Sequence, residues 1–171
     1  MPYDPGTGGR GGAPAFDYER FLAGLDQFRL PAHPLPGPGA RLRRWGSGPL
    51  QPYNGFTSDE RIHMWQLQEW AREAGLYPAL GTCVACGARP GEIFHSENYA
   101  DLWNVIRVCR SCHSAIHSRF RHPAAWARRL ALNTCESGGQ WLKLLPSEPI
   151  DVAGWLRARN VPSFLWQTPR R

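Results

Sequence analysis

The sequence predicts a small α+β domain with flanking helices, and three observations support this fold class. Two Cys-x2-Cys pairs, Cys83–Cys86 and Cys109–Cys112, stand 22 residues apart. Between them lie two short segments, 92–94 and 103–108, whose apolar and β-branched residues suit strands. The stretch 114–120, after the second pair, has the pattern of a helix.

The length of 171 residues and a hydrophobic content of 42% suit one domain with extensions. Three regions follow from the composition. A Gly/Pro-rich arm or linker covers 1–55, a helix with the cysteine block and a following helix covers 56–135, and a Trp-rich extension that packs on the core covers 136–171. Within the arm, apolar residues at helical spacing predict a short helix over 18–28.

Two longer helices are predicted around the cysteine block. The first spans 56–74, with Ser58 as N-cap and Gly75 as terminator. Its apolar residues at helical spacing should form a core-facing stripe: Met64, Leu67, Ala71 and Ala74. The second runs from Pro123, a residue favoured at the first helical position, to Leu132.

The composition also indicates the cellular compartment in which we expect the protein. No run approaches the roughly 18 apolar residues of a membrane-spanning helix. The first 14 residues are polar and Gly/Pro-rich, unlike a secretory signal peptide. We therefore expect a cytoplasmic protein that does not enter membranes, in which cysteines serve metal binding or catalysis more often than disulfides.

The net charge is +6, and all but one of the 20 basic residues are arginine. Arginine binds phosphate bidentately, which favours a nucleic-acid partner, although a GC-rich genome would produce the same bias. No acidic residue occurs between Asp101 and Glu136. Because the charged side chains of this segment are all positive, we predict that four of its arginines contact phosphates: Arg107, Arg110, Arg119 and Arg121.

The four paired cysteines predict a structural zinc site. Thiolates are soft ligands, and four of them in a tetrahedral arrangement select Zn²⁺. Gly87 directly follows Cys86, where a knuckle turn commonly needs a positive φ. A redox Cys-x-x-Cys pair is the alternative, but two pairs at this spacing argue against it. Cys135 stands apart and is interpreted as a buried or incidental thiol.

About 35 of the 171 residues resemble an HNH endonuclease domain with a zinc-bound ββα-metal, treble-clef-like core. The resemblance is carried by Cys83-x2-Cys86, by His95-Ser-Glu-Asn-Tyr99, and by the string from Asn104 through Cys109-x2-Cys112-His113 to His117. It implies that Asn104 fixes the turn between the strands. It also implies that His95 and His117 hold a catalytic divalent ion, Mg²⁺ or Mn²⁺, at the scissile phosphate.

The same resemblance places Ser96 where the family usually carries its general-base histidine. A hydroxyl is a poor base at neutral pH, whereas imidazole suits the task. Shifting the register by one residue makes His95 the base, but it then leaves Phe94 at the metal position. Glu97 could supply a substitute carboxylate for a hard cation. His113 is expected to pack or to hydrogen-bond.

Two functions from different classes remain open. The first is a metal-dependent endonuclease that hydrolyses phosphodiester bonds, with DNA as the expected substrate. The second, which Ser96 favours, is a catalytically lapsed zinc module that binds nucleic acid or a protein without cleavage. The Trp-rich C-terminal region also leaves room for a protein partner.

Overall fold

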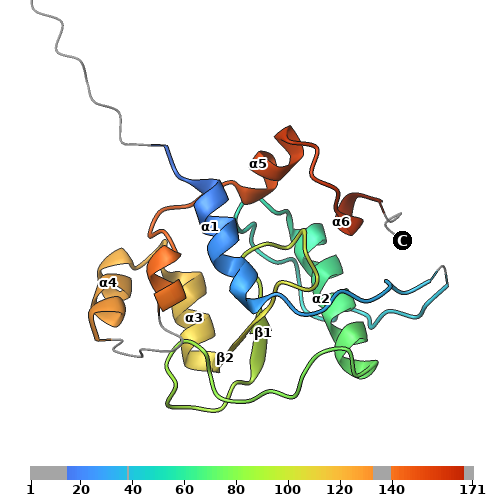
Figure 1. Ribbon diagram of the computed structural model, residues 1–171, viewed down its shortest axis with the longest axis horizontal. Coiled ribbons are helices and arrows are strands. Elements are labelled where there is room, and N and C mark those ends of the chain that lie inside the picture. The colour runs from blue at the N-terminus through green and yellow to red at the C-terminus, as the bar shows by residue number, and fades with distance from the viewer. Residues whose placement is uncertain (1–14, 38, 133–139, 168–171) are drawn as a thin grey trace, which may run out of the picture.

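The computed structural model describes residues 15–37, 39–132 and 140–167. Its centre is an antiparallel hairpin of β1 (Ile93–His95) and β2 (Ile106–Val108), in which Ile93 pairs with Val108 and His95 with Ile106. Helix α3 (Arg110–Ser118) follows β2 and contacts β1. Figure 1 shows α2 and α3 on opposite sides of the two strands in this view. The described part of the chain is therefore a small α+β fold with one two-stranded sheet.

The sequence correctly predicts the position of the main helices. α1 (Tyr18–Leu25) continues into a 3-10 turn that ends at Phe28. α2 covers Ser58–Glu73, and Gly75 follows it with φ of +70°. α4 covers Pro123–Leu132, as expected. The predicted helix over 114–120 begins earlier, at Arg110, because the second cysteine pair lies at its start.

The N-cap of α2 differs from the prediction. Thr57, rather than Ser58, accepts the hydrogen bond from the Glu60 amide at 3.3 Å. Glu60 Oε2 accepts in return from the Thr57 amide at 2.8 Å, which completes a capping box. Ser58 instead accepts from the amide of Leu50 at 2.9 Å and so ties the preceding segment to the helix.

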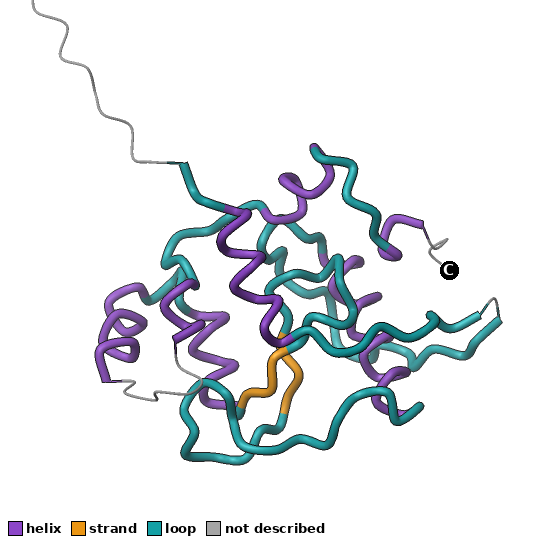
Figure 2. The backbone as a smooth tube through the Cα atoms, in the orientation of Figure 1, coloured by secondary structure: helices purple, strands orange, loops and turns teal. Residues whose placement is uncertain are grey.

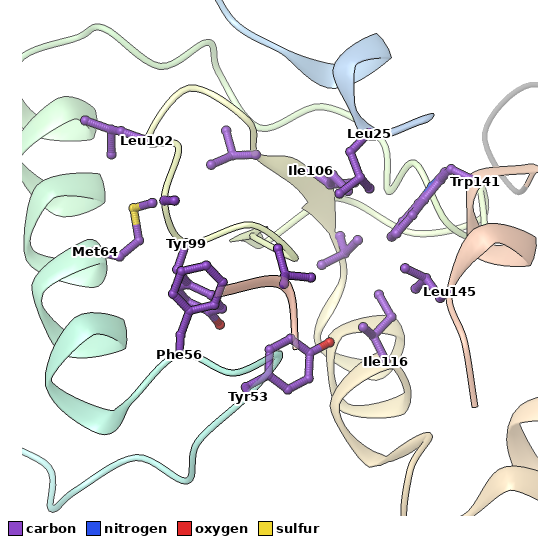
Figure 3. Close-up of a cluster of buried hydrophobic side chains, with 14 of the residues drawn as sticks. Leu25, Tyr53, Phe56, Met64, Tyr99, Leu102, Ile106, Ile116, Trp141 and Leu145 are labelled. Carbon is purple, nitrogen blue, oxygen red and sulfur yellow. The ribbon is translucent and has the colours of Figure 1, made fainter. Parts of the chain in front are cut away.

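The hydrophobic core draws on every region of the chain (Figure 3). Leu25 and Tyr53 come from the N-terminal region, and Met64 comes from α2. The C-terminal region adds a 3-10 turn (Gln140–Leu144), α5 (Val152–Ala158) and α6 (Phe164–Gln167). These elements bury further apolar side chains, among them Trp141, Leu142, Leu156 and Leu165.

Long loops connect these elements (Figure 2). Residues 31–37 form no helix or strand and are mostly exposed, as their Pro/Gly content predicts. No helix within the described ranges is long and apolar enough to cross a membrane. Cys135 and the Gly138–Gly139 break lie outside the described residues.

Candidate metal centres

The four paired cysteines converge, as predicted. The Sγ atoms of four residues all lie within 4.8 Å of one another: Cys83, Cys86, Cys109 and Cys112. Tetrahedral zinc with Zn–S bonds of 2.3 Å places sulfurs about 3.8 Å apart, so small movements suffice to close the site. These four close cysteines could therefore hold a metal ion such as zinc.

Local geometry explains how the two knuckles meet. Gly87 has φ of +64°, and its amide donates to the carbonyl of Cys83 at 2.9 Å. The Val84 amide donates to the carbonyl of Arg107 at 2.9 Å, which docks the first knuckle on β2. Cys109 caps α3 and Cys112 lies in its first turn, so the second knuckle is fixed by the start of a helix.

The charge state of this cluster depends on what it holds. Burial raises the pKa of the Cys83 thiol and of the Cys112 thiol. Both are therefore protonated at neutral pH when no cation is present, and a bound metal ion must displace their protons. Arg129 Nη1 from α4 donates to Cys112 Sγ at 3.3 Å and supplies positive charge beside the thiolates.

A second cluster, the histidine triad, consists of His95, His113 and His117. His95 ends β1, and the other two residues lie one turn apart on α3. One ring nitrogen of each lies within 4.8 Å of the others, and the ring centroids are 4.6–5.4 Å apart. His113 thus joins the two histidines that the resemblance implied as ligands, whereas we had expected it only to pack or to hydrogen-bond.

A buried carboxylate fixes the orientation of His95. His95 Nε2 lies 2.8 Å from Glu97 Oε1, and both side chains are fully buried. Because an ionised carboxylate only accepts hydrogen bonds, Nε2 donates a proton to Glu97, and Nδ1 is the ring nitrogen left for another partner. His95 Nδ1 is buried and has no hydrogen-bond partner. A buried ring nitrogen without a hydrogen-bond partner, beside two further imidazoles, fits a metal ligand, and the carboxylate–histidine pair is typical of metal-binding histidines.

Glu97 itself is held by a buried network. Tyr53 Oη donates to Oε1 at 2.6 Å, Asn54 Nδ2 donates to Oε2 at 2.7 Å, and Arg119 Nη2 donates to Oε2 at 3.1 Å. Burial alone would raise the pKa of the Glu97 carboxyl, but the Arg119 charge and these hydrogen bonds outweigh it and hold the pKa well below its usual range. Glu97 is therefore ionised.

This network corrects two expectations. Both oxygens of Glu97 are engaged with its buried partners, so it is a partner of His95 rather than a substitute metal ligand. Arg119 is fully buried and also donates through Nε to the carbonyl of Pro146 at 2.8 Å. It is therefore not available for the nucleic-acid contact that we predicted, because an unpaired carboxylate in the interior is too costly to leave behind.

The other two histidines are neutral at physiological pH. Burial, followed by the proximity of His95, lowers the pKa of His113 to about 4 and that of His117 to about 2. Neutral imidazole is the form that binds metal ions. Three imidazoles suit transition metals such as zinc, nickel or iron, whereas Mg²⁺ prefers oxygen ligands. The triad therefore fits a transition metal better than the Mg²⁺ of the initial expectation.

The triad lines a pocket of about 420 Å³, which we call the histidine pocket. Ser96 also lines it, and its Oγ accepts from Gln68 Nε2 at 2.9 Å. Ser96 is buried and hydrogen-bonds an amide, which is not a base, so nothing in this contact activates the hydroxyl.

The remaining predicted residues do not line the histidine pocket. Asn104 is buried and donates through Nδ2 to Asp26 Oδ1 at 3.3 Å. It lines a separate pocket of about 580 Å³. Arg107 pairs with Phe94 across the hairpin. The Arg110 side chain is 82% exposed and pairs with Glu92, and Arg121 is exposed.

Several residues of the histidine pocket were not predicted from the sequence. Arg61, Trp65, Gln68 and Arg72 all lie on α2 and line the pocket. A signal for them exists, since these positions follow the i, i+4, i+7, i+11 spacing of one helical face. This face lies about a quarter turn around the helix from the buried stripe of Met64, Leu67 and Ala71. By contrast, no local pattern marks Tyr53 and Asn54, which reach Glu97 from more than 40 residues away.

Comparisons with protein-family models, with curated proteins and with solved structures find no match to this chain. The resemblance to HNH domains therefore rests on the residues and spacings of this sequence alone. The structure adds the convergence of the four cysteines and of the three histidines.

Proposed function

We propose that this protein is an HNH-like, zinc-stabilised nuclease that hydrolyses phosphodiester bonds with a divalent metal ion at the histidine triad. The observation that carries the proposal is the convergence of His95, His113 and His117 in one pocket, with His95 Nδ1 buried and unpartnered. Three imidazoles without a fourth protein ligand resemble catalytic rather than structural metal sites, which keep a position open for water or substrate.

The two metal centres have different tasks. The cysteine cluster uses all four of its ligands for one ion, which suits a structural role. It joins the segment before β1 to the start of α3, and α3 carries His113 and His117. The zinc ion thus fixes the helix that presents two of the three histidines.

An ion held by His95, His113 and His117 would supply Lewis-acid chemistry: it would polarise a phosphate and lower the pKa of a bound water. The protein keeps its three ligands neutral by burial and orients His95 through Glu97. Arg61 supplies positive charge in the same pocket, and among the described residues no carboxylate forms an ion pair with it. A phosphate at the triad would therefore find a cation nearby.

The exposed arginines of the neighbouring segments provide a surface for the rest of the nucleic-acid backbone. Arg110 begins α3, Arg121 follows it, and Arg128 lies on α4; all three are exposed. Their positive charge suits sequence-independent contacts to phosphates, with DNA as the expected substrate. Such binding should weaken steeply with salt.

A second candidate function is favoured by Ser96. If no group replaces the family's general base, the same fold would bind nucleic acid or a protein partner without cleaving it. The buried Ser96 hydroxyl, hydrogen-bonded to Gln68, supports this alternative. It predicts binding without turnover, so the two candidates separate in one assay.

The test is incubation of the zinc-loaded protein with supercoiled plasmid and Mg²⁺, Mn²⁺, Co²⁺ or Ni²⁺. We expect nicking that requires the added ion and is lost in His95→Ala/His117→Ala. A matched control is His33→Ala, an exposed histidine packed on Trp103, which should nick like the parent protein. Salt-sensitive retardation of the plasmid without nicking would establish the binding module instead. If the plasmid is neither nicked nor retarded, the nuclease and the nucleic-acid-binding module are both contradicted, and only a module that binds a protein partner is left.

A further inference from the structure

The histidine pocket has an aromatic wall that the metal chemistry does not use. Trp65 lies on the pocket face of α2, and Trp45 comes from the segment before it. Their ring centroids are 4.9 Å apart with an interplanar angle of 74°. Both rings are only partly buried, although indole is among the most favourable side chains to bury. Two partly open indoles thus stand in the same pocket as three candidate metal ligands.

Trp45 is held in place rather than free to collapse. Its Nε1 donates to the carbonyl of Gly48 at 2.9 Å, which fixes the ring on its own loop. The segment before it is anchored to α2 by Arg43, whose Nη1 lies 2.8 Å from Glu69 Oε2, and by Gln66, whose Nε2 donates to the carbonyl of Arg43 at 3.0 Å. The wall is therefore preorganised before any ligand binds.

The charge of the pocket suits an anionic ligand. Arg43 and Arg72 both pair with Glu69 at 2.8 Å, and Arg72 also lies 3.9 Å from Glu73, so these charges balance and the positive charge of the pocket without an ion-pair partner among the described residues is that of Arg61. Arg61 stacks near Tyr53 and Tyr99, at 5.3 and 5.2 Å, and its buried Nε has no hydrogen-bond partner. Among the described residues that line the pocket, one further carboxylate occurs, that of Glu92, and it is paired with Arg110.

Resting on the proposed function, we infer that the histidine pocket holds an unpaired base on Trp65 and Trp45, and that the substrate is single-stranded nucleic acid. Aromatic faces stack on any exposed base, whereas the bases of a duplex are already stacked on one another. The arginines would contact the adjoining phosphates, one of which lies toward the triad. The pocket volume of about 420 Å³ lies in the range of small-ligand sites, which a single nucleotide would occupy.

The test measures binding without added divalent ion, so it does not depend on cleavage. The probes are a fluorescein-labelled 12-nucleotide thymidine strand, the same strand with abasic residues, and a 12-base-pair duplex, read by fluorescence anisotropy. We expect the thymidine strand to bind more tightly than the other two. Trp65→Ala should weaken its binding by about 5- to 150-fold and leave the abasic strand unchanged, while Trp65→Phe should retain most of the affinity.

The matched control is Trp155→Ala, which removes a partly buried indole that lines the other pocket and stacks on Tyr18 at 5.7 Å. It should bind the thymidine strand like the parent protein, and all variants should show cooperative thermal unfolding. Equal affinity for duplex and single strand, or an unchanged Trp65→Ala, would overturn the inference. Single-strand binding with no cleavage of either the thymidine strand or plasmid under any metal would instead overturn the proposed nuclease and leave this site standing.

Discussion

His95 and Glu97 form a fully buried pair in which Nε2 and Oε1 are 2.8 Å apart. This contact orients the His95 ring and engages Nε2, so Nδ1 is the nitrogen that could bind a metal ion with His113 and His117. The carboxylate accepts from Nε2, and Nδ1 is the ring nitrogen left without a hydrogen-bond partner in a cluster with the other two histidines. Tyr53, Asn54 and Arg119 hold the carboxylate in turn, so the ring orientation is fixed by residues spread over the whole domain.

Glu97→Gln should weaken metal binding at the triad by about 10- to 100-fold, because an amide orients His95 less strongly and lowers its basicity. Isothermal titration of the zinc-loaded protein with Co²⁺ measures the effect. The control is Glu92→Gln, which removes a half-exposed carboxylate of the same pocket whose partner is Arg110. Equal Co²⁺ affinity in both variants would show that Glu97 does not act on His95.

Arg119→Met should destabilise the fold by about 3–5 kcal/mol, because it leaves the carboxylate of Glu97 buried without its countercharge. Chemical denaturation measures the loss. Arg110→Met provides the comparison, since its ion pair with Glu92 is solvent-exposed and such pairs contribute little. Similar stabilities for the two variants would contradict the central place of the Glu97–Arg119 pair.

Removing one zinc ligand should unfold the central block. In Cys83→Ser or Cys109→Ser, the remaining three cysteines no longer complete a tetrahedral site, and metal binding supplies roughly 10 kcal/mol or more of folding free energy in small zinc domains. We expect both variants, and the chelator-treated parent protein, to lose the cooperative thermal transition. Cys135→Ser, which lies in neither pair, should keep it. A sharp transition after complete zinc removal would refute a structural role.

The zinc-loaded protein without added divalent ion should lose stability as the pH falls below about 6.5. The pKa values of His113 and His117 are lowered to about 4 and about 2 in the folded state, so between pH 6.5 and 4 the unfolded chain takes up protons that the folded chain does not. Each histidine then contributes a slope of up to about 1.4 kcal/mol per pH unit. Urea unfolding at pH 7.5 and 5.5 should show this, and a His113→Gln/His117→Gln variant should show a smaller difference.

Local patterns predicted the parts of the fold that local physics determines. The cysteine spacing indicated the convergence of the knuckles, Pro123 marked the start of α4, and Gly75 marked the end of α2. Position within a few residues was less well determined, because Thr57 and Ser58 are both good N-caps and only the capping box with Glu60 decides between them.

The buried network could not be predicted in this way. Arg119 follows the i, i+4, i+7 spacing of the buried Cys112 and Ile116, whereas the exposed Arg121 does not. Such a stripe, however, predicts an apolar side chain rather than an arginine buried against Glu97. Tyr53 lies in a Gly/Pro-rich region whose composition predicts an arm or linker, but tertiary packing places its hydroxyl against Glu97. The burial of Arg119 and the position of Tyr53 both depend on contacts between distant segments, which composition and periodicity do not predict.

The most direct test of two distinct metal centres is native mass spectrometry of the protein after zinc loading and addition of Co²⁺ or Ni²⁺. We predict two metal ions per chain in the parent protein and one in His95→Ala/His117→Ala, with the remaining ion being the cysteine-bound zinc. A single ion per chain in both proteins would contradict a metal site at the histidine triad, and with it the proposed nuclease.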